Sequence, residues 1–361
     1  MNTSSLTPYR MIRSIIHPLV RDLAWSILSA TIIRTPISFS PKQDDTNPQI
    51  PNPTDHLPSL YAWLKEVDHN PQTLIDHLSQ GKDHRLGIYF EQLICFWLKA
   101  QGEIFHQNLA IHDEHRTIGA FDVIIVRNTH SLHLEFTVKY YLEVSQSNQE
   151  PRWVGLQKRD NFQKKLLRLQ EHQLKLGTHP ASRQLFTSLN LKKIVRSEAW
   201  VKGILFAQWN ENLTMNPSAY RVRGLWIRSH QFQSFNHWLI NHIHQLTQMI
   251  YTPLFYIRFK PQWLAPLTVS IDPEEPLEVT LKRDPLALNP SEVQQLPDTL
   301  INGYWGDREL KKGLMTSELV LASLEDIMLE KKRPIHLSVL FRFSPNRYDE
   351  SLRLVITPDD W

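Results

Sequence analysis

Residues 117–144 read TIGAFDVIIVRNTHSLHLEFTVKYYLEV and predict the central hairpin of the protein. Two runs rich in β-branched and aromatic residues flank a polar turn at residues 127–130, as in a β-hairpin. With an even-length loop the opposed residue numbers sum to 257, so Asp122 stands opposite Glu135 and both carboxylates share a face. An odd-length loop would shift the pairing by one residue and separate the two acids.

Both strands of this hairpin are apolar on both faces, which is typical of buried strands. A buried pair of carboxylates is costly unless a cation compensates it or one member binds a proton. Hard divalent cations such as Mg²⁺ prefer oxygen ligands, commonly one or two carboxylates with water. The pair therefore indicates a metal site. The alternative is a half-exposed hairpin whose acids pair with an arginine or lysine of a neighbouring element.

The elements on either side of the hairpin predict a mixed α/β domain. An amphipathic helix is expected over residues 12–33, a proline-rich linker over 36–57, and a buried helix over 86–98 that contains Glu91. The other expected elements are helices at 60–67, 72–78, 158–176 and 237–250, and strands at 103–107, 108–111, 121–127, 132–144, 200–208 and 220–227.

The sequence becomes acidic and proline-punctuated from about residue 267. Helical stretches are expected near 292–296 and 316–330, and a closing hairpin over 335–343 and 351–356. We therefore predict three regions: an N-terminal helix and linker (1–57), a core (58–265) and an acidic α+β region (266–361).

Charge is distributed unevenly along the 361 residues, although the net charge is only +3. Residues 152–196 carry 11 Lys/Arg against 2 acids, a balance of +9. Residues 268–361 carry 11 Lys/Arg against 17 Asp/Glu, a balance of −6. This asymmetry predicts one surface for a polyanion and an acidic region suited to a protein partner.

The cysteine and hydropathy patterns exclude several classes of protein. The single Cys95 rules out an intramolecular disulfide framework and indicates a buried small hydrophobe. The histidines lack partner ligands at the spacing of a zinc site. The N-terminus lacks the pattern of a signal peptide, and no apolar run reaches the roughly 18 residues that span a bilayer. We expect a cytoplasmic protein with no membrane segment; its oligomeric state is not predicted.

Six segments are distinctive: HRLGIYFEQLICFWL (84–98), GAFD (119–122), HLEFTVKYYL (133–142), LQEHQLKL (169–176), RGLWI (223–227) and ITPDDW (356–361). Together they resemble bacterial proteins catalogued as domain of unknown function 1853. That family is assigned to the PD-(D/E)XK nuclease-like superfamily. The resemblance implies a restriction-endonuclease-like mixed sheet flanked by helices, with N-terminal helical and C-terminal α+β additions.

The same resemblance implies a metal site for Mg²⁺ or Mn²⁺. Asp122 matches the strand aspartate, Glu135 the metal-binding glutamate and Glu91 the helical glutamate upstream. Two positions depart from the motif: Ala120 replaces an acid, and Thr137 stands where the catalytic lysine is expected. Lys139 is the available lysine, on the same strand face but roughly 13 Å beyond Glu135.

A cluster of basic residues follows the second strand of the hairpin, and such a face suits the phosphate backbone of a nucleic acid. Its members are Lys158, Arg159, Lys164, Lys165 and Arg168. A solvated amphipathic helix is the alternative interpretation.

The main functional hypothesis is a metal-dependent nuclease acting on DNA or RNA, with Asp122, Glu135 and Lys139 as catalytic residues. The second is a catalytically inactive nuclease-fold module that binds nucleic acid or protein. The third is a structural protein that docks a partner through its acidic C-terminal region.

Overall fold

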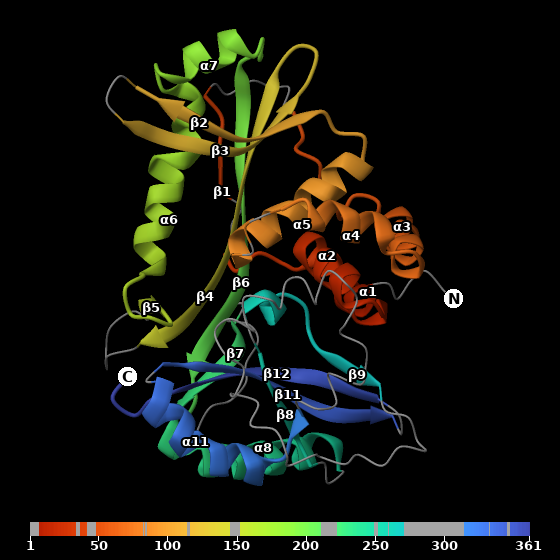
Figure 1. Ribbon diagram of the computed structural model, residues 1–361, viewed down its shortest axis with the longest axis vertical. Helices are drawn as coiled ribbons and strands as arrows, with labels where there is room; N and C mark the ends of the chain where they lie inside the picture. Colours follow the sequence, from red (N-terminus) through yellow and green to blue (C-terminus); the bar gives the residue numbers. More distant parts are fainter. Residues whose placement is uncertain are drawn as a thin grey trace. The chain divides into compact units, whose positions relative to one another are not determined.

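The computed structural model divides into two compact units, and two long strands contribute to both. Unit 1 comprises Met1–Lys139 and Asn161–Gly203, and unit 2 comprises Tyr140–Asp160 and Ile204–Trp361. Strands β4 (Ser131–Val144) and β6 (Ile194–Gln208) each begin in unit 1 and end in unit 2 (Figure 1). The limits of these units do not fall at residues 57 and 265, where the sequence predicted the ends of the first two regions. The structure describes residues 7–33, 37–41, 48–81, 83, 85–113, 116–144, 152–210, 222–248, 252–258, 260–270, 314–331, 333–344 and 347–361.

The N-terminal part of unit 1 is helical. Its helices are α1 (Pro8–Ser14), α2 (Pro18–Leu28), α3 (Leu57–His69), α4 (Gln72–Ser79) and α5 (Leu86–Ala100). The single helix expected over 12–33 is wrong: α1 ends before Pro18, which lacks an N–H and occupies the first turn of α2.

The proline-rich stretch is not only a linker. Residues Ile37–Phe39 form strand β1, which pairs antiparallel with β6. Residues 36 and 42–47 of the predicted linker lie outside the described residues.

Helix α5 is confirmed as a mostly buried helix, and this burial fixes the location of Glu91. Phe90, Leu93 and Leu98 are fully buried, and the Phe90 ring meets Trp25 of α2 edge-on at 6.5 Å between centroids. Glu91 itself is half-buried on α5. The packing of α5 against α2 therefore holds this acid on a fixed element.

The hairpin register predicted from the sequence is confirmed. Strand β3 (Thr117–Val126) pairs antiparallel with β4, with Val126 opposite Ser131 and Val123 opposite Leu134. The expected strands 103–107 and 108–111 are instead one strand, β2 (Phe105–His112), antiparallel to β3. Asn108 adopts φ 54° inside this strand, yet the register is the same on both sides of it and shifts only between Ile111 and His112.

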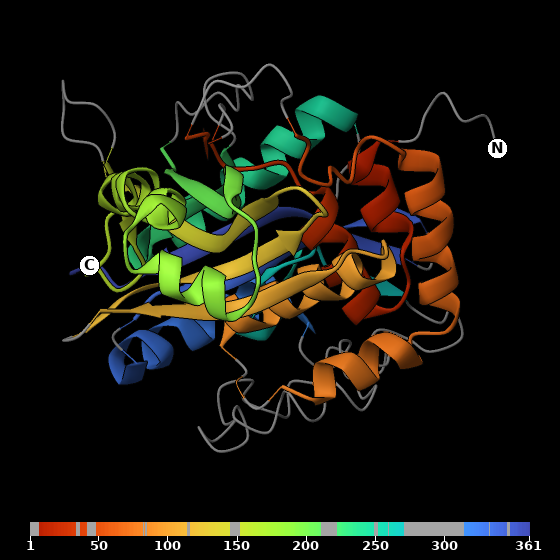
Figure 2. The same ribbon diagram turned by 90° about the horizontal axis from the view of Figure 1, so that it is seen from above.

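Helices cover both faces of the strands of unit 1. Helix α6 (Phe162–Glu171), the short 3-10 helix η2 (Gln173–Thr178) and α7 (Ser182–Ser188) lie on one side, and α2 to α5 lie on the other (Figures 1 and 2).

The basic helix expected to start at residue 158 begins at Phe162. Asn161 caps α6 by accepting the backbone N–H of Lys164 at 3.0 Å. Lys158 adopts φ 61° in a turn closed by its own N–H to the carbonyl of Gly155. The turn and the cap together prevent the helix from starting earlier.

Unit 2 confirms the C-terminal helix and hairpin. Its elements are β5 (Arg152–Gly155), β7 (Val222–Arg228), α8 (Phe232–Thr247), β8 (Leu254–Ile257), β9 (Thr268–Ser270), β10 (Leu314–Met315), α11 (Ser317–Lys331), β11 (Ile335–Ser344) and β12 (Arg347–Thr357). The helix predicted at 292–296 lies outside the described residues.

The described strands belong to one mixed sheet of twelve strands, which confirms a mixed α/β class. Its order is β10-β8-β11-β12-β7-β6-β4-β3-β2, with β1 paired to β6, β5 to β4 and β9 to β12. Strand β7 is parallel to both β6 and β12, whereas the hairpins are antiparallel.

A buried ionic cluster lies inside unit 2. Glu350 accepts hydrogen bonds from Arg258 (2.8 Å), Arg353 and Ser338. His336 is 2% exposed beside them, and neither of its ring nitrogens has a hydrogen-bond partner. Burial and the two nearby arginines hold the pKa of His336 well below its usual value. This imidazole is therefore neutral in the folded protein.

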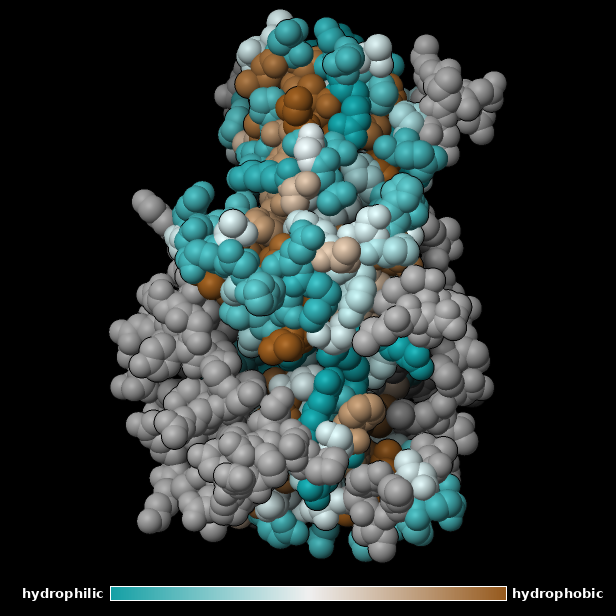
Figure 3. Space-filling model, turned by 90° about the vertical axis from the view of Figure 1, so that its right-hand side faces the viewer, coloured by the Kyte–Doolittle hydropathy of each residue, from teal (hydrophilic) through white to brown (hydrophobic). Residues whose placement is uncertain are grey.

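Across the described residues, no helix is both long enough and apolar enough to cross a bilayer. On the face shown in Figure 3, hydrophilic residues cover much of the coloured surface, and hydrophobic residues gather mainly near the upper end.

Candidate active site

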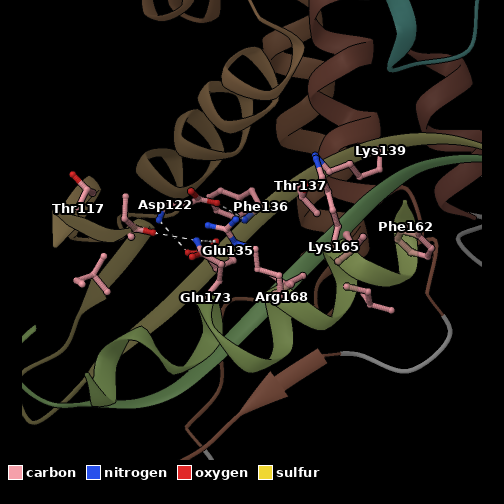
Figure 4. A pocket seen from close by; sticks show the side chains of 16 residues that line it. Thr117, Asp122, Glu135, Phe136, Thr137, Lys139, Phe162, Lys165, Arg168 and Gln173 are labelled. Carbon is pink, nitrogen blue, oxygen red and sulfur yellow. Dashed lines mark hydrogen bonds between the residues drawn. The ribbon is translucent and has the colours of Figure 1, made fainter. Parts of the chain in front are cut away.

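A pocket of about 590 Å³ in unit 1 contains the acidic pair (Figure 4). Strands β3 and β4 supply Asp122, Glu135 and Lys139 to its wall, and α6 supplies Lys165 and Arg168. The other lining residues are Thr117, Ile118, Gly119, Ala120, Phe136, Thr137, Phe162, Leu166, Leu169, Gln173 and Val201.

Asp122 and Glu135 are adjacent, as the hairpin register requires. The backbone N–H of Phe136 donates to Oδ2 of Asp122 at 2.8 Å, and the N–H of Asp122 lies 3.4 Å from Oε1 of Glu135. The Asp122 side chain thus accepts the Phe136 N–H, which in a regular antiparallel pair would donate to a backbone carbonyl of β3. The regular pairing of β3 and β4 is described as far as Val123 and Leu134.

Glu135 is only 5% exposed, and side chains of His133 and Gln173 contact its two oxygens. His133 Nε2 lies 2.8 Å from Oε1, and Gln173 Nε2 donates to Oε2 at 3.4 Å. Gln173 also reaches the carbonyl of Ala120 at 3.5 Å. The carboxylate therefore has a defined orientation toward the pocket.

His133 is itself held within the sheet. Its Nδ1 lies 3.1 Å from the hydroxyl of Ser197 on β6, and the ring meets Phe121 edge-on at 4.8 Å between centroids. Neither His133 nor Gln173 was predicted from the sequence as a partner of Glu135. His133 was recognisable because it precedes Glu135 by two residues and so shares its strand face. Nothing local to Ser197 or Gln173 places either residue near the acids.

Two acids of the site are harder to ionise than ordinary carboxylic acids. Burial, followed by the charge of Glu135, raises the pKa of Asp122 to about 8. Burial and the same charge raise the pKa of Glu91 on α5 to about 7. The fold thus brings all three predicted acids within electrostatic range of one another.

Lys139 is the cation of β4 that acts on these acids. Its charge lowers the pKa of both Asp122 and Glu91, opposing their burial. The backbone at Lys139 is fixed by Gly203 of β6, whose φ is 131° and whose added Cβ would lie 1.7 Å from the Lys139 carbonyl oxygen. Thr137, at the motif position of the lysine, also lines the pocket.

The carboxylates suit a divalent cation bound by few protein ligands. Among the described residues, no group of three His, Cys, Asp or Glu side chains is close enough to form a metal site. Glu91, Asp122 and Glu135 therefore do not form a closed three-ligand cage. Two adjacent carboxylates nevertheless match the protein ligands that Mg²⁺ commonly uses together with water and phosphate. In the described part of the chain, neither Asp122 nor Glu135 is paired with an arginine or lysine.

The five predicted basic residues do not form one cluster on one helix. Lys165 and Arg168 line the pocket from α6, whereas Lys164 is exposed on α6 outside the pocket lining. Lys158 and Arg159 precede the helix and belong to unit 2. Lys158 Nζ lies 5.0 Å from the ring of Trp361 and 3.4 Å from the carbonyl of Asp360. The structure thus places only Lys165 and Arg168 beside the acids.

A protein-family model described as "Domain of unknown function (DUF1853)" matches residues 21–295, more than half of the chain. The chain belongs to the DUF1853 family. No curated protein and no solved structure matches it.

The span that matches DUF1853 contains the whole candidate site, from Glu91 to Val201. It ends before β11 and β12, which complete the sheet of unit 2. The family resemblance in residues 84–98 and 133–142 thus corresponds to α5 and β4, the elements that carry Glu91 and Glu135.

Proposed function

We propose that this DUF1853 protein is a metal-dependent nuclease that hydrolyses phosphodiester bonds of DNA or RNA, built on a PD-(D/E)XK restriction-endonuclease-like core. The observation that carries the proposal is the adjacency of Asp122 and Glu135 in a pocket that also contains Lys139, Lys165 and Arg168. Adjacent acids that pair with no arginine or lysine of the described residues, and that face basic side chains across a pocket, are suited to bind a cation and a phosphate together.

Asp122 and Glu135 would hold Mg²⁺ or Mn²⁺. Glu91 of α5 would contribute to the binding of the cation directly or through a water. When bound, the cation supplies Lewis acidity, which favours ionisation of water and offsets charge on phosphate oxygens. The raised pKa values of Asp122 and Glu91 support this assignment, because a cation removes the repulsion that raises them.

The other residues of the pocket would bind and orient the reacting groups. His133 and Gln173 fix the Glu135 carboxylate, so that its oxygens need no reorganisation when a cation arrives. Lys139 lies on the carboxylate strand and offsets negative charge near the acids. Lys165 and Arg168 lie on the opposite wall, where they would bind the phosphates of the substrate.

A cleavage assay tests this function. Purified protein would be incubated with Mg²⁺ or Mn²⁺ and with single-stranded and duplex DNA and RNA, beside an Asp122→Asn variant. Asparagine retains an oxygen that can accept the Phe136 N–H, so the substitution removes charge with little change in shape. Cleavage by the wild type alone supports the proposal. Equal cleavage by both proteins would assign the activity to a contaminant or another site.

The second candidate is an inactive nuclease-fold module that binds nucleic acid. Thr137 at the lysine position, Ala120 at an acid position and the lack of a three-ligand group among the described residues favour it. Calorimetry that detects no Mn²⁺ binding, combined with salt-dependent DNA binding, would select this candidate. A protein partner for the acidic C-terminal region remains a prediction, since residues 271–313 lie outside the described structure.

A further inference from the structure

The acids of the candidate site are reached through a pocket with two different walls. Glu135 is 5% exposed, and Asp122 is half-buried beside it. Helix α6 supplies one wall of the pocket and the hairpin β3–β4 supplies the wall that carries the carboxylates (Figure 4). Helix α6 and the hairpin therefore both restrict the shape of a ligand that binds in the pocket.

The α6 wall alternates between charged and apolar side chains. Lys165 and Arg168 are three residues apart and exposed, and they line the pocket together with the half-buried Leu166 and Leu169. Ile118 supplies apolar surface from β3. A ligand that pairs with the cations and also packs on the apolar side chains carries a negative charge close to a ring. Nucleotides have this combination.

The size of the pocket suits one unpaired nucleotide. Cavities of roughly 300–1,000 Å³ enclose ligands of small-molecule size. The pocket volume of about 590 Å³ lies within that range, so the pocket can enclose a ligand of the size of one nucleotide. A paired base exposes only its edges in the grooves, and extracting it from a duplex costs a few kcal/mol.

We infer that the pocket binds one unpaired nucleotide, so that the substrate is a single strand, a strand end or a nucleotide displaced from a duplex. Its phosphate lies between the carboxylates and the cations Lys165 and Arg168, and its base or sugar lies on Leu166, Leu169 and Ile118. This inference rests on the proposed function for the identity of the ligand as a nucleic acid.

Fluorescence anisotropy with the full-length protein tests the inference without requiring catalysis. The probes are a labelled oligothymidylate of about 12 nucleotides and a duplex of the same length, each measured in Ca²⁺ and in EDTA. We expect the single strand to bind about tenfold more tightly, because stacking and strand flexibility favour unpaired nucleotides in such grooves. Equal or tighter binding of the duplex would overturn the inference.

Neighbouring residues of α6 provide matched controls. Lys165→Ala and Leu166→Ser alter the pocket, whereas Lys164→Ala and Leu167→Ser alter exposed positions outside its lining. The pocket variants should weaken single-strand binding several-fold, and the outer variants by less than about twofold. Equal losses in both pairs would overturn the pocket assignment. Lys165 is exposed, so its variant tests the assignment even if Leu166→Ser fails to fold.

The failures of the two proposals are distinguishable. Selective single-strand binding without cleavage in Mg²⁺ or Mn²⁺ would refute the nuclease and retain the pocket assignment. Cleavage of duplex DNA by a protein that binds both probes equally would support the nuclease and refute the pocket assignment.

Discussion

The Nε2 atom of His133 lies 2.8 Å from the Oε1 atom of Glu135, and both side chains are buried. The contact links two residues on one face of β4, and Ser197 on β6 holds the other side of the imidazole. The second oxygen of Glu135 has a longer contact, 3.4 Å from Gln173. The histidine is therefore the main protein group that sets the orientation of this acid.

Replacing His133 should impair the site more than it impairs the fold. In His133→Phe the ring volume is retained, but the hydrogen bonds to Glu135 and Ser197 are lost. We expect Mn²⁺ affinity to fall by about 10–100-fold, as is typical when a group orienting a metal ligand is removed. His133→Gln, whose amide can donate to Glu135, should recover part of the affinity. Calorimetry provides the measurement, and equal affinity in the wild type and His133→Phe would contradict the assigned role.

The cation-free protein should gain stability when Asp122 loses its charge. The folded state holds the pKa of Asp122 at about 8, above its ordinary value of 3.8. The folded state therefore binds more protons than the unfolded state between these values, and stability falls as pH rises through this window. In EDTA at about pH 8.5, Asp122→Asn should unfold a few °C above the wild type. Near pH 4 the difference should vanish. A lower melting temperature for the variant at the higher pH would contradict the electrostatic account.

Unit 2 should lose stability in mild acid because His336 is buried without a proton. Its pKa is well below the ordinary value of 6.5, so the unfolded state binds the proton that the folded state excludes. Stability should fall as pH drops below about 6.5, and His336→Phe should flatten this slope between about pH 5 and 7. His237→Ala, at an exposed position on α8, is the control and should leave the slope unchanged. Thermal unfolding across this pH range measures both.

Gly203 and Gly87 should respond oppositely to alanine. At Gly203 a Cβ would lie 1.7 Å from the Lys139 carbonyl oxygen, and φ is 131°. We expect Gly203→Ala to cost more than about 3 kcal/mol of unfolding free energy or to prevent folding. At Gly87, in α5, a Cβ meets nothing within 4 Å, so Gly87→Ala should be neutral or stabilise by about 0.5–1 kcal/mol. Denaturant titration gives both values; similar costs would contradict the close approach of β4 and β6.

The sequence predicted the elements whose patterns are local. The turn at residues 127–130 set the register that places Asp122 beside Glu135, and the apolar stretch 86–98 predicted α5. These segments are specified by alternation and helical periodicity within a few residues. The resemblance to DUF1853 then selected Glu91 as the third acid, which the fold brings within electrostatic range of Glu135.

Features that depend on distant contacts or local caps were missed. Gln173 and Ser197 reach Glu135 and His133 only through the packing of η2 and β6 beside β4. The sequence predicted one helix from Lys158 through α6. The turn from Gly155 to Lys158 and the Asn161 cap separate the first basic residues from that helix. Charge spacing alone does not reveal such a break.

Calorimetric titration of Mn²⁺ into the wild type and the Asp122→Asn variant is the measurement that most directly tests whether the acids share a cation. We predict saturable binding by the wild type, and binding weakened by orders of magnitude in the variant, since one of two carboxylate ligands is lost. Unchanged affinity in Asp122→Asn, or no binding by the wild type, would contradict the assignment of this pair as a metal site.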